Sequence, residues 1–331
     1  GATNTKVTQN GATAINIYGG CEGVRISNSP EVTNSVVNIN GAYAKNVYGG
    51  NMGTGTVKYA TVNVSGNSNI AGYIFGGGYQ SNIGKSGADG SATINITGGT
   101  FHNDIVGGSE RGMVYGTTTV NIGKETVTDT SLQGTRIVIV GNVYGAGDAI
   151  NPSYKETSVK GSTHVNMFNS NSSPITFENS IFGSGNGANY EPKDSADEST
   201  IKVKGFGSSA NSHKMTSIER TGKVYIQSSY LELTGAQNEY NLYKNTSYTL
   251  NRITNGLALL DNSTLYTQRG FNMVGGFESL LSTGDNSTIK ETATIANDKV
   301  TRNVDNRIYT FEGVNLILAK QEGDLADKYN Q

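Results

Sequence analysis

Six short phrases in the first two thirds of the chain place an apolar residue, usually an aromatic one, directly before a glycine. Aromatic faces beside accessible backbone suit sugar rings or an extended peptide, and a row of them on a surface would form a binding stripe. The alternative is an internal stack in which the glycines are required for tight bends. The aromatic members, our candidate binding residues, are Tyr18, Tyr48, Phe75, Tyr144 and Phe182, with Val106 between the third and the fourth.

Carboxylates form the second group of residues that could do chemistry. Asp194, Asp197 and Glu198 are the densest cluster, in a loop that begins at Tyr190. A β-helical glycosidase or lyase would set two or three such groups on adjacent coils, for example together with Asp148, as an acid–base pair or as calcium ligands. No acidic residue recurs at a fixed position of the strand phrases described below, so we expect no catalytic set. Tyr190, Asp194 and Asp197 stay as candidate binding residues.

Metal and nucleophile chemistry have little support in the sequence. The glycine turn that ends at Asp148 lacks the repeated G-G-x-G-x-D pattern of calcium-binding solenoids. The three histidines are far apart, and no Ser-His-Asp or Cys-His grouping is visible. The single cysteine, Cys21, cannot form an intrachain disulfide and is interpreted as a small core residue. We therefore predict no metal, no cofactor and no catalytic residue.

The elements that must position these residues are short strands. Several phrases alternate apolar and polar residues with a period of two, which indicates half-buried strands. They alternate with the glycine phrases from Tyr18 to Ile201, and the residues before the first glycines lie 30, 27, 31, 38 and 38 positions apart. The strand phrases are Val37–Gly41, Val62–Gly66, Ile94–Gly98 and Val120–Gly123, with weaker echoes at Val165–Met167 and Ile201–Gly205.

Internal repeats of this length indicate a solenoid, a propeller or an array. A propeller blade usually needs about 40 residues, more than most of these units have. We predict an all-β fold, a right-handed parallel β-helix (β-solenoid) of roughly eleven coils. Residues 1–212 are predicted to form Gly-rich coils, and 213–331 continuing, less regular coils. Insertions such as 79–92 and 109–117 are predicted to be polar loops at one corner.

Composition narrows the function classes. The chain has 331 residues, a net charge of −2 and 16% charged residues. Nucleic-acid binding needs clustered Lys and Arg, so no nucleic-acid partner is expected. The sequence shows no signal peptide, no long apolar stretch and no lipidation motif. We interpret it as part of a larger secreted protein that contacts a membrane only through an anchor outside this fragment.

The V-N-I-x-G and V-Y-G-G phrases of residues 14–205 resemble the Gly-rich β-helical repeat regions of large surface proteins from Gram-positive gut bacteria. Those regions are adhesin-like and pectin-lyase-like in fold. The resemblance implies an extracellular location on the bacterial cell surface. It says little about activity, because proteins that bind, cut or merely extend share the residues that form coils.

Together these observations predict a cell-surface binding protein, or adhesin, that recognises its ligand through a solenoid face or its corner loops. The expected partner is a host surface or secreted protein (a matrix protein, mucin or immunoglobulin) or a glycan. One alternative is a carbohydrate-active β-helix enzyme, a polysaccharide lyase or glycoside hydrolase, which requires converging acidic residues. The other is a passive surface stalk without a ligand.

Overall fold

The structure is a computed structural model. It describes residues 3–23, 31–87, 89–125, 135–148, 158–171, 173–185, 199–208, 210–219, 221 and 223–234, and strand backbone alone at 189–190 and in six runs beyond residue 256. Strand is the only regular structure in these ranges, and no helix occurs among them. The chain divides into two compact units, Gly1–Ile201 and Lys202–Gln331, which we describe separately. The predicted change of coil type at residue 212 stays a prediction.

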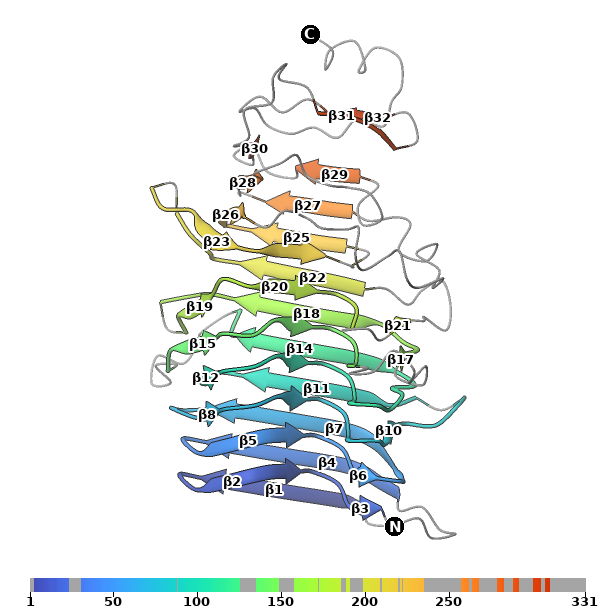
Figure 1. Ribbon diagram of the computed structural model, residues 1–331. Helices are drawn as coiled ribbons and strands as arrows, with labels where there is room; N and C mark the ends of the chain where they lie inside the picture. The colour runs from blue at the N-terminus through green and yellow to red at the C-terminus, as the bar shows by residue number, and fades with distance from the viewer. Residues whose placement is uncertain are drawn as a thin grey trace. The chain divides into compact units, whose positions relative to one another are not determined.

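One long parallel sheet receives a strand from each repeat of the first unit (Figure 1). Its pairs from β1 to β18 are parallel and in register, so that Val37 lies opposite Val62 and Val62 opposite Ile94. Most apolar residues of these strands are buried and most polar residues face outward, as the two-residue period predicts, whereas Ser35, Thr118 and Thr163 are buried hydroxyl residues. The strands, in spatial order, are β1 (Asn4–Asn10), β4 (Glu31–Asn40), β7 (Thr56–Ser65), β11 (Ser91–Ile96), β14 (Thr117–Gly123), β18 (Thr163–Phe168) and β22 (Ser199–Lys204).

A second parallel sheet packs against the first and receives one strand, or two short ones, from each repeat. The β-branched residues of the glycine phrases, such as Val47, Ile74 and Ile105, are fully buried in it. Its strands are β2 (Thr13–Tyr18), β5 (Tyr43–Tyr48), β8 (Asn69–Ile70), β9 (Ile74–Phe75), β12 (Gly99–Phe101), β13 (Ile105–Val106), β15 (Ile137–Ile139), β16 (Val143–Tyr144), β19 (Ile175–Phe177) and β20 (Ser180–Phe182).

The first glycine of each phrase is required by close stacking of the repeats. A Cβ atom on Gly49 would collide with the carbonyl oxygen of Gly76, and one on Gly76 with that of Gly107. Hydroxyls of the first sheet also use these carbonyls, as Ser35 Oγ does when it donates to the Gly49 oxygen at 2.6 Å. The glycine is therefore a packing requirement, because no side chain fits between one repeat and the next.

A third, short line of parallel contacts follows the glycine phrases. β3 (Glu22–Gly23) pairs with β6 (Met52–Gly53), and single bridges continue the line from Met52 to Tyr79 and then to Glu110 and Asp148. Nearby, β10 (Asn82–Ile83) pairs with β7, and β17 (Ser158–Val159) pairs with β21 (Asn189–Tyr190). Residues 79–92 and 109–117, predicted to be loops, thus contain parallel strand contacts. The prediction of loops was wrong for these residues, because their polar composition gave no sign of the single buried positions among them.

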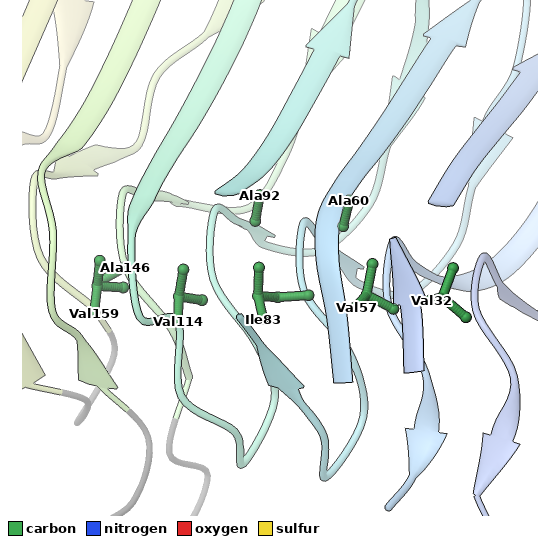
Figure 2. Close-up of a cluster of buried hydrophobic side chains, with 8 residues drawn as sticks. All are labelled: Val32, Val57, Ala60, Ile83, Ala92, Val114, Ala146 and Val159. Carbon is green, nitrogen blue, oxygen red and sulfur yellow. The ribbon is translucent and has the colours of Figure 1, made fainter. Parts of the chain in front are cut away.

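A cluster of small and branched apolar side chains closes the corner between this line and the first sheet (Figure 2). Figure 2 shows its branched members following one another from coil to coil. Cys21 packs against the cluster and is partly buried, which agrees with its interpretation as a core residue. The members are Val32, Val57, Ala60, Ile83, Ala92, Val114, Ala146 and Val159.

The second unit also consists of stacked parallel strands among its described residues. One row is β25 (Lys223–Gln227), β27 (Leu257–Asp261) and β29 (Ser279–Ser282). A second row is β23 (His213–Met215), β26 (Tyr230–Leu233), β28 (Thr264–Thr267) and β30 (Thr288–Glu291). β24 (Ser217–Glu219) lies between β23 and β25 in sequence, and β31 (Val300–Val304) pairs antiparallel with β32 (Arg307–Tyr309).

The prediction of an all-β chain built from parallel, stacked strands is confirmed. The arrangement is that of a β-solenoid-like repeat: within the first unit, strands that are distant in sequence pair with the equivalent strands of the neighbouring repeats. This pairing is what gives each short strand a buried face and satisfied backbone groups.

Candidate functional site

Five asparagines form a hydrogen-bonded ladder on the outer face of the first sheet. They occupy one register position on β4, β7, β11, β14 and β18. From the second asparagine on, each side-chain amide nitrogen donates to the amide oxygen of the preceding repeat, at 2.8, 2.9, 2.9 and 2.8 Å in chain order. The ladder consists of Asn38, Asn63, Asn95, Asn121 and Asn166.

The ladder leaves hydrogen-bonding capacity at the surface. An amide carries two N–H donors and an oxygen with two lone pairs, and a ladder member such as Asn95 uses one donor and one acceptor site within the ladder. All five side chains are half-buried, so solvent reaches them. Neighbouring strands lie about 4.8 Å apart, so a donor and an acceptor recur at about that interval along the row.

Hydroxyl groups flank the ladder on both sides. Two positions before the asparagines stand Thr61, Thr93 and Thr119, which are half-buried and in register with one another. Two positions after them stand Ser65 and Thr97, also half-buried. From β4 to β14 these three columns contain no charged residue. The centre of the face is therefore flat, neutral and rich in groups that both donate and accept hydrogen bonds.

The predicted aromatic stripe is not exposed. Tyr48, Phe75, Tyr144 and Phe182 are 5%, 0%, 6% and 8% exposed, and Tyr18 is half-buried. Their rings stack, with centroids 4.9 Å apart for Tyr18 and Tyr48, 5.1 Å for Tyr48 and Phe75, and 4.8 Å for Tyr144 and Phe182. Of the two alternatives left open by the sequence, the internal stack is the one formed.

The stack is buried because the segments that follow the glycines cover it. Tyr73 and Tyr79 pack against it, and the Tyr79 ring meets the Tyr48 ring edge-on with centroids 5.8 Å apart. The Tyr48 hydroxyl donates to Glu110 Oε2 at 2.7 Å. The aromatic residues therefore form a second core outside the second sheet, and of the five candidate binding residues in it only Tyr18 is partly accessible.

Two buried carboxylates lie in this cover, and sequence reasoning missed their pairing. Glu110 and Asp148 are bridge partners on adjacent repeats, and they are 6% and 2% exposed. Both stand four positions after the aromatic or Val position of their glycine phrase, as Glu22, Met52 and Tyr79 also do. That fixed offset from the glycine phrases was the available signal, and the strand phrases contain no trace of it.

The electrostatics of this pair favour a proton on Asp148. Burial, followed by the nearby Glu110 and Asp104 carboxylates, raises the pKa of Asp148 to about 7, while Arg111 acts in the opposite direction. Asp148 Oδ1 has no hydrogen-bond partner in the described part of the chain. Burial and the Glu110 contact also raise the pKa of Tyr48 well above its usual range.

The remaining predicted site residues lie outside what can be described. Asp194, Asp197 and Glu198 lie outside the described residues, and of Tyr190 only the backbone is described, where it pairs with Val159. The asparagine ladder was not among the predicted site residues. Its signal was the Asn that recurs in the middle of the V-N-I phrase.

Comparisons with known proteins give no family for the chain: no family model, no curated protein and no solved structure matches it significantly. Among the described residues, no His, Cys, Asp and Glu side chains gather in threes or more in a way that could hold a metal ion. The same part of the chain contains no helix long and apolar enough to span a membrane.

Proposed function

We propose that this chain is an extracellular recognition module that binds its ligand through the outer face of the first sheet. The observation that carries the proposal is the asparagine ladder, which repeats one hydrogen-bonding group in register over five strands. Flanking hydroxyls widen it to a face of three columns. A repeat fold offers such extended surfaces as a consequence of its stacking.

Rigidity supports this role. Each ladder amide is held by its neighbours, and the strands beneath are fixed by buried side chains and by glycine contacts that admit no side chain. A preorganised face loses little conformational freedom on binding, so weak individual contacts can add to a useful affinity. The aromatic stack is buried, so it contributes to this rigidity and does not form an exposed binding surface.

The finer parts of the proposal rest on the sequence. We infer a right-handed β-helix of roughly eleven coils, since crossovers between parallel strands are overwhelmingly right-handed. The resemblance of residues 14–205 to surface proteins of Gram-positive gut bacteria supports display on a bacterial cell surface, with an anchor elsewhere. An adhesin of this kind would meet a matrix protein, a mucin, an immunoglobulin or a glycan.

The test is binding of the immobilised protein to a glycan array and to purified matrix proteins, mucins and immunoglobulins. Thr119→Lys places a long charged side chain at the edge of the ladder, whereas Thr100→Lys makes the same change on the outward side of β12. A ligand that is lost with Thr119→Lys and kept with Thr100→Lys supports the proposed face. A ligand equally insensitive to both changes contradicts it.

A carbohydrate-active enzyme is the second candidate, because two carboxylates do converge on adjacent repeats. Glu110 and Asp148 are nevertheless 6% and 2% exposed, so a sugar cannot touch them without movement of the covering segments. Incubation with neutral and acidic polysaccharides, followed by assay for new chain ends, tests this candidate. Cleavage that disappears in Glu110→Gln would favour the enzyme over the binding module.

A further inference from the structure

We propose that the ligand of the ladder face is a neutral polysaccharide whose chain lies along the asparagine row. This inference rests on the proposed function and adds the chemical class of its ligand. The relevant surface comprises the three outward columns of β4, β7, β11 and β14, with the ladder in the centre.

The hydrogen-bonding pattern favours polyhydroxylated partners. At each internal step of the ladder one amide N–H and one oxygen lone pair remain after the ladder bonds are made. Threonine hydroxyls beside them also donate and accept. An ionised sulfate, phosphate or carboxylate group offers only acceptors and would leave the oxygen lone pairs opposite it unmatched. Sugar hydroxyls match both kinds of group.

The lack of charge at the centre of the face also favours a neutral polysaccharide. Anionic polymers are bound by clustered Lys and Arg, often as bidentate contacts. The columns of Thr61, Thr93 and Thr119 and of the ladder hold no cation from β4 to β14. The nearby Lys58 is exposed at the start of β7 and its ammonium lies 5.1 Å from the centre of the Tyr59 ring, at the margin of the face. A neutral polymer is therefore the partner whose charge matches the centre of the face.

Repetition accounts for how such a face could bind a polymer better than a single sugar. The central columns contain no aromatic ring from β4 to β14, so each repeat supplies only a few hydrogen bonds that compete with water. Linking many weak contacts on one chain makes the later contacts effectively intramolecular. Affinity is therefore expected to rise steeply with the number of sugar units until the row is filled.

The experiment compares co-sedimentation of the whole chain with insoluble neutral polysaccharides (cellulose, chitin, mannan) and with anionic ones (polygalacturonate, alginate). The doubly substituted Thr93→Lys/Thr119→Lys protein is the test variant, and Thr100→Lys is the matched control. Circular dichroism and the unfolding midpoint confirm that both variants fold. Soluble oligosaccharides of increasing length are then used as competitors for the polysaccharide that binds.

We expect binding to at least one neutral polysaccharide that is unchanged between about 0.05 and 0.5 M salt, since no ion pairs are involved. The double substitution is expected to weaken it at least about tenfold, because ladder groups lose their partners, and Thr100→Lys to leave it intact. Longer oligosaccharides are expected to compete better.

Preference for an anionic polymer, or binding that falls with salt, would overturn the inference. If binding of the anionic polymer were lost with the double substitution, the proposed binding face would still be supported, and only the proposed ligand class would be wrong. Binding to a neutral polysaccharide that survives the double substitution would place the site elsewhere and overturn both. No binding to any polysaccharide overturns the inference, and the protein arrays described above then decide the proposed function.

Discussion

Replacing Asp148 by Asn is expected to remove a pH-dependent loss of stability that the buried carboxylate imposes. In the folded protein the pKa of Asp148 is raised from 3.8 to about 7, chiefly by burial and then by Glu110. The folded state therefore binds this proton more tightly than the unfolded state does. Stability falls as pH rises through this interval, because the unfolded chain releases the proton first.

The magnitude follows from the width of that interval. A pKa difference of roughly three units at about 1.4 kcal/mol per unit corresponds to roughly 4 kcal/mol between about pH 4 and pH 7. Asn keeps the size of the side chain and cannot ionise. The Asp148→Asn protein is therefore expected to match the parent near pH 5 more closely than at pH 8, where it is the more stable of the two.

Urea unfolding followed by circular dichroism at intervals from pH 4 to pH 9 measures the difference. Asp89→Asn, the same change at an exposed carboxylate, is the matched control for the loss of one acidic side chain. Parallel curves for Asp148→Asn and the parent protein would refute the reasoning. A free energy of unfolding that rises with pH more in the parent protein than in Asp148→Asn would refute it as well.

Three further substitutions, one of them with a matched control, test the packing and the ladder. Tyr48→Phe removes the hydroxyl bound to Glu110 and is expected to cost about 1–3 kcal/mol in urea unfolding, since a buried carboxylate loses its partner. Gly76→Ala is expected to lower the free energy of unfolding by about 3 kcal/mol or more, because its Cβ collides with the next repeat. Gly41→Asn is the control and is expected to cost little, because Gly41 has open space around it and a left-handed backbone that Asn tolerates. Equal effects of the two substitutions would contradict the packing argument. Asn95→Ala breaks two ladder bonds and is expected to lower the free energy of unfolding by about 1–2 kcal/mol. An unchanged free energy of unfolding would show that the ladder is not stabilising.

The strands were predictable because their signal is local. Val37 and Ile39 alternate with Asn38 and Asn40, and the structure buries the first pair and turns the second outward. Because the same phrase recurs in later repeats, parallel stacking of the repeats can be predicted from the sequence alone. Alternation also placed Val47 and Tyr48 on opposite sides of their strand, and both are buried.

The direction of a side chain did not decide its exposure. Tyr48 points away from the first core, but the segments that follow the glycines of the next two repeats pass over its ring and bury it under Tyr79 and Glu110. This cover is made by single bridging residues inside stretches of polar composition, which carry no periodicity of their own. For the same reason the pairing of Glu110 with Asp148 depends on the offset from the glycines and not on a strand pattern.

The asparagine row also has a direction. In each of the four bonds the amide nitrogen donates to the preceding repeat, so all four run the same way from Asn166 back to Asn38. The side-chain dipoles are aligned and polarise one another. At the Asn38 end the row presents N–H groups, and at the Asn166 end it presents oxygen. A polymer with two chemically different ends therefore meets a surface that distinguishes its two orientations.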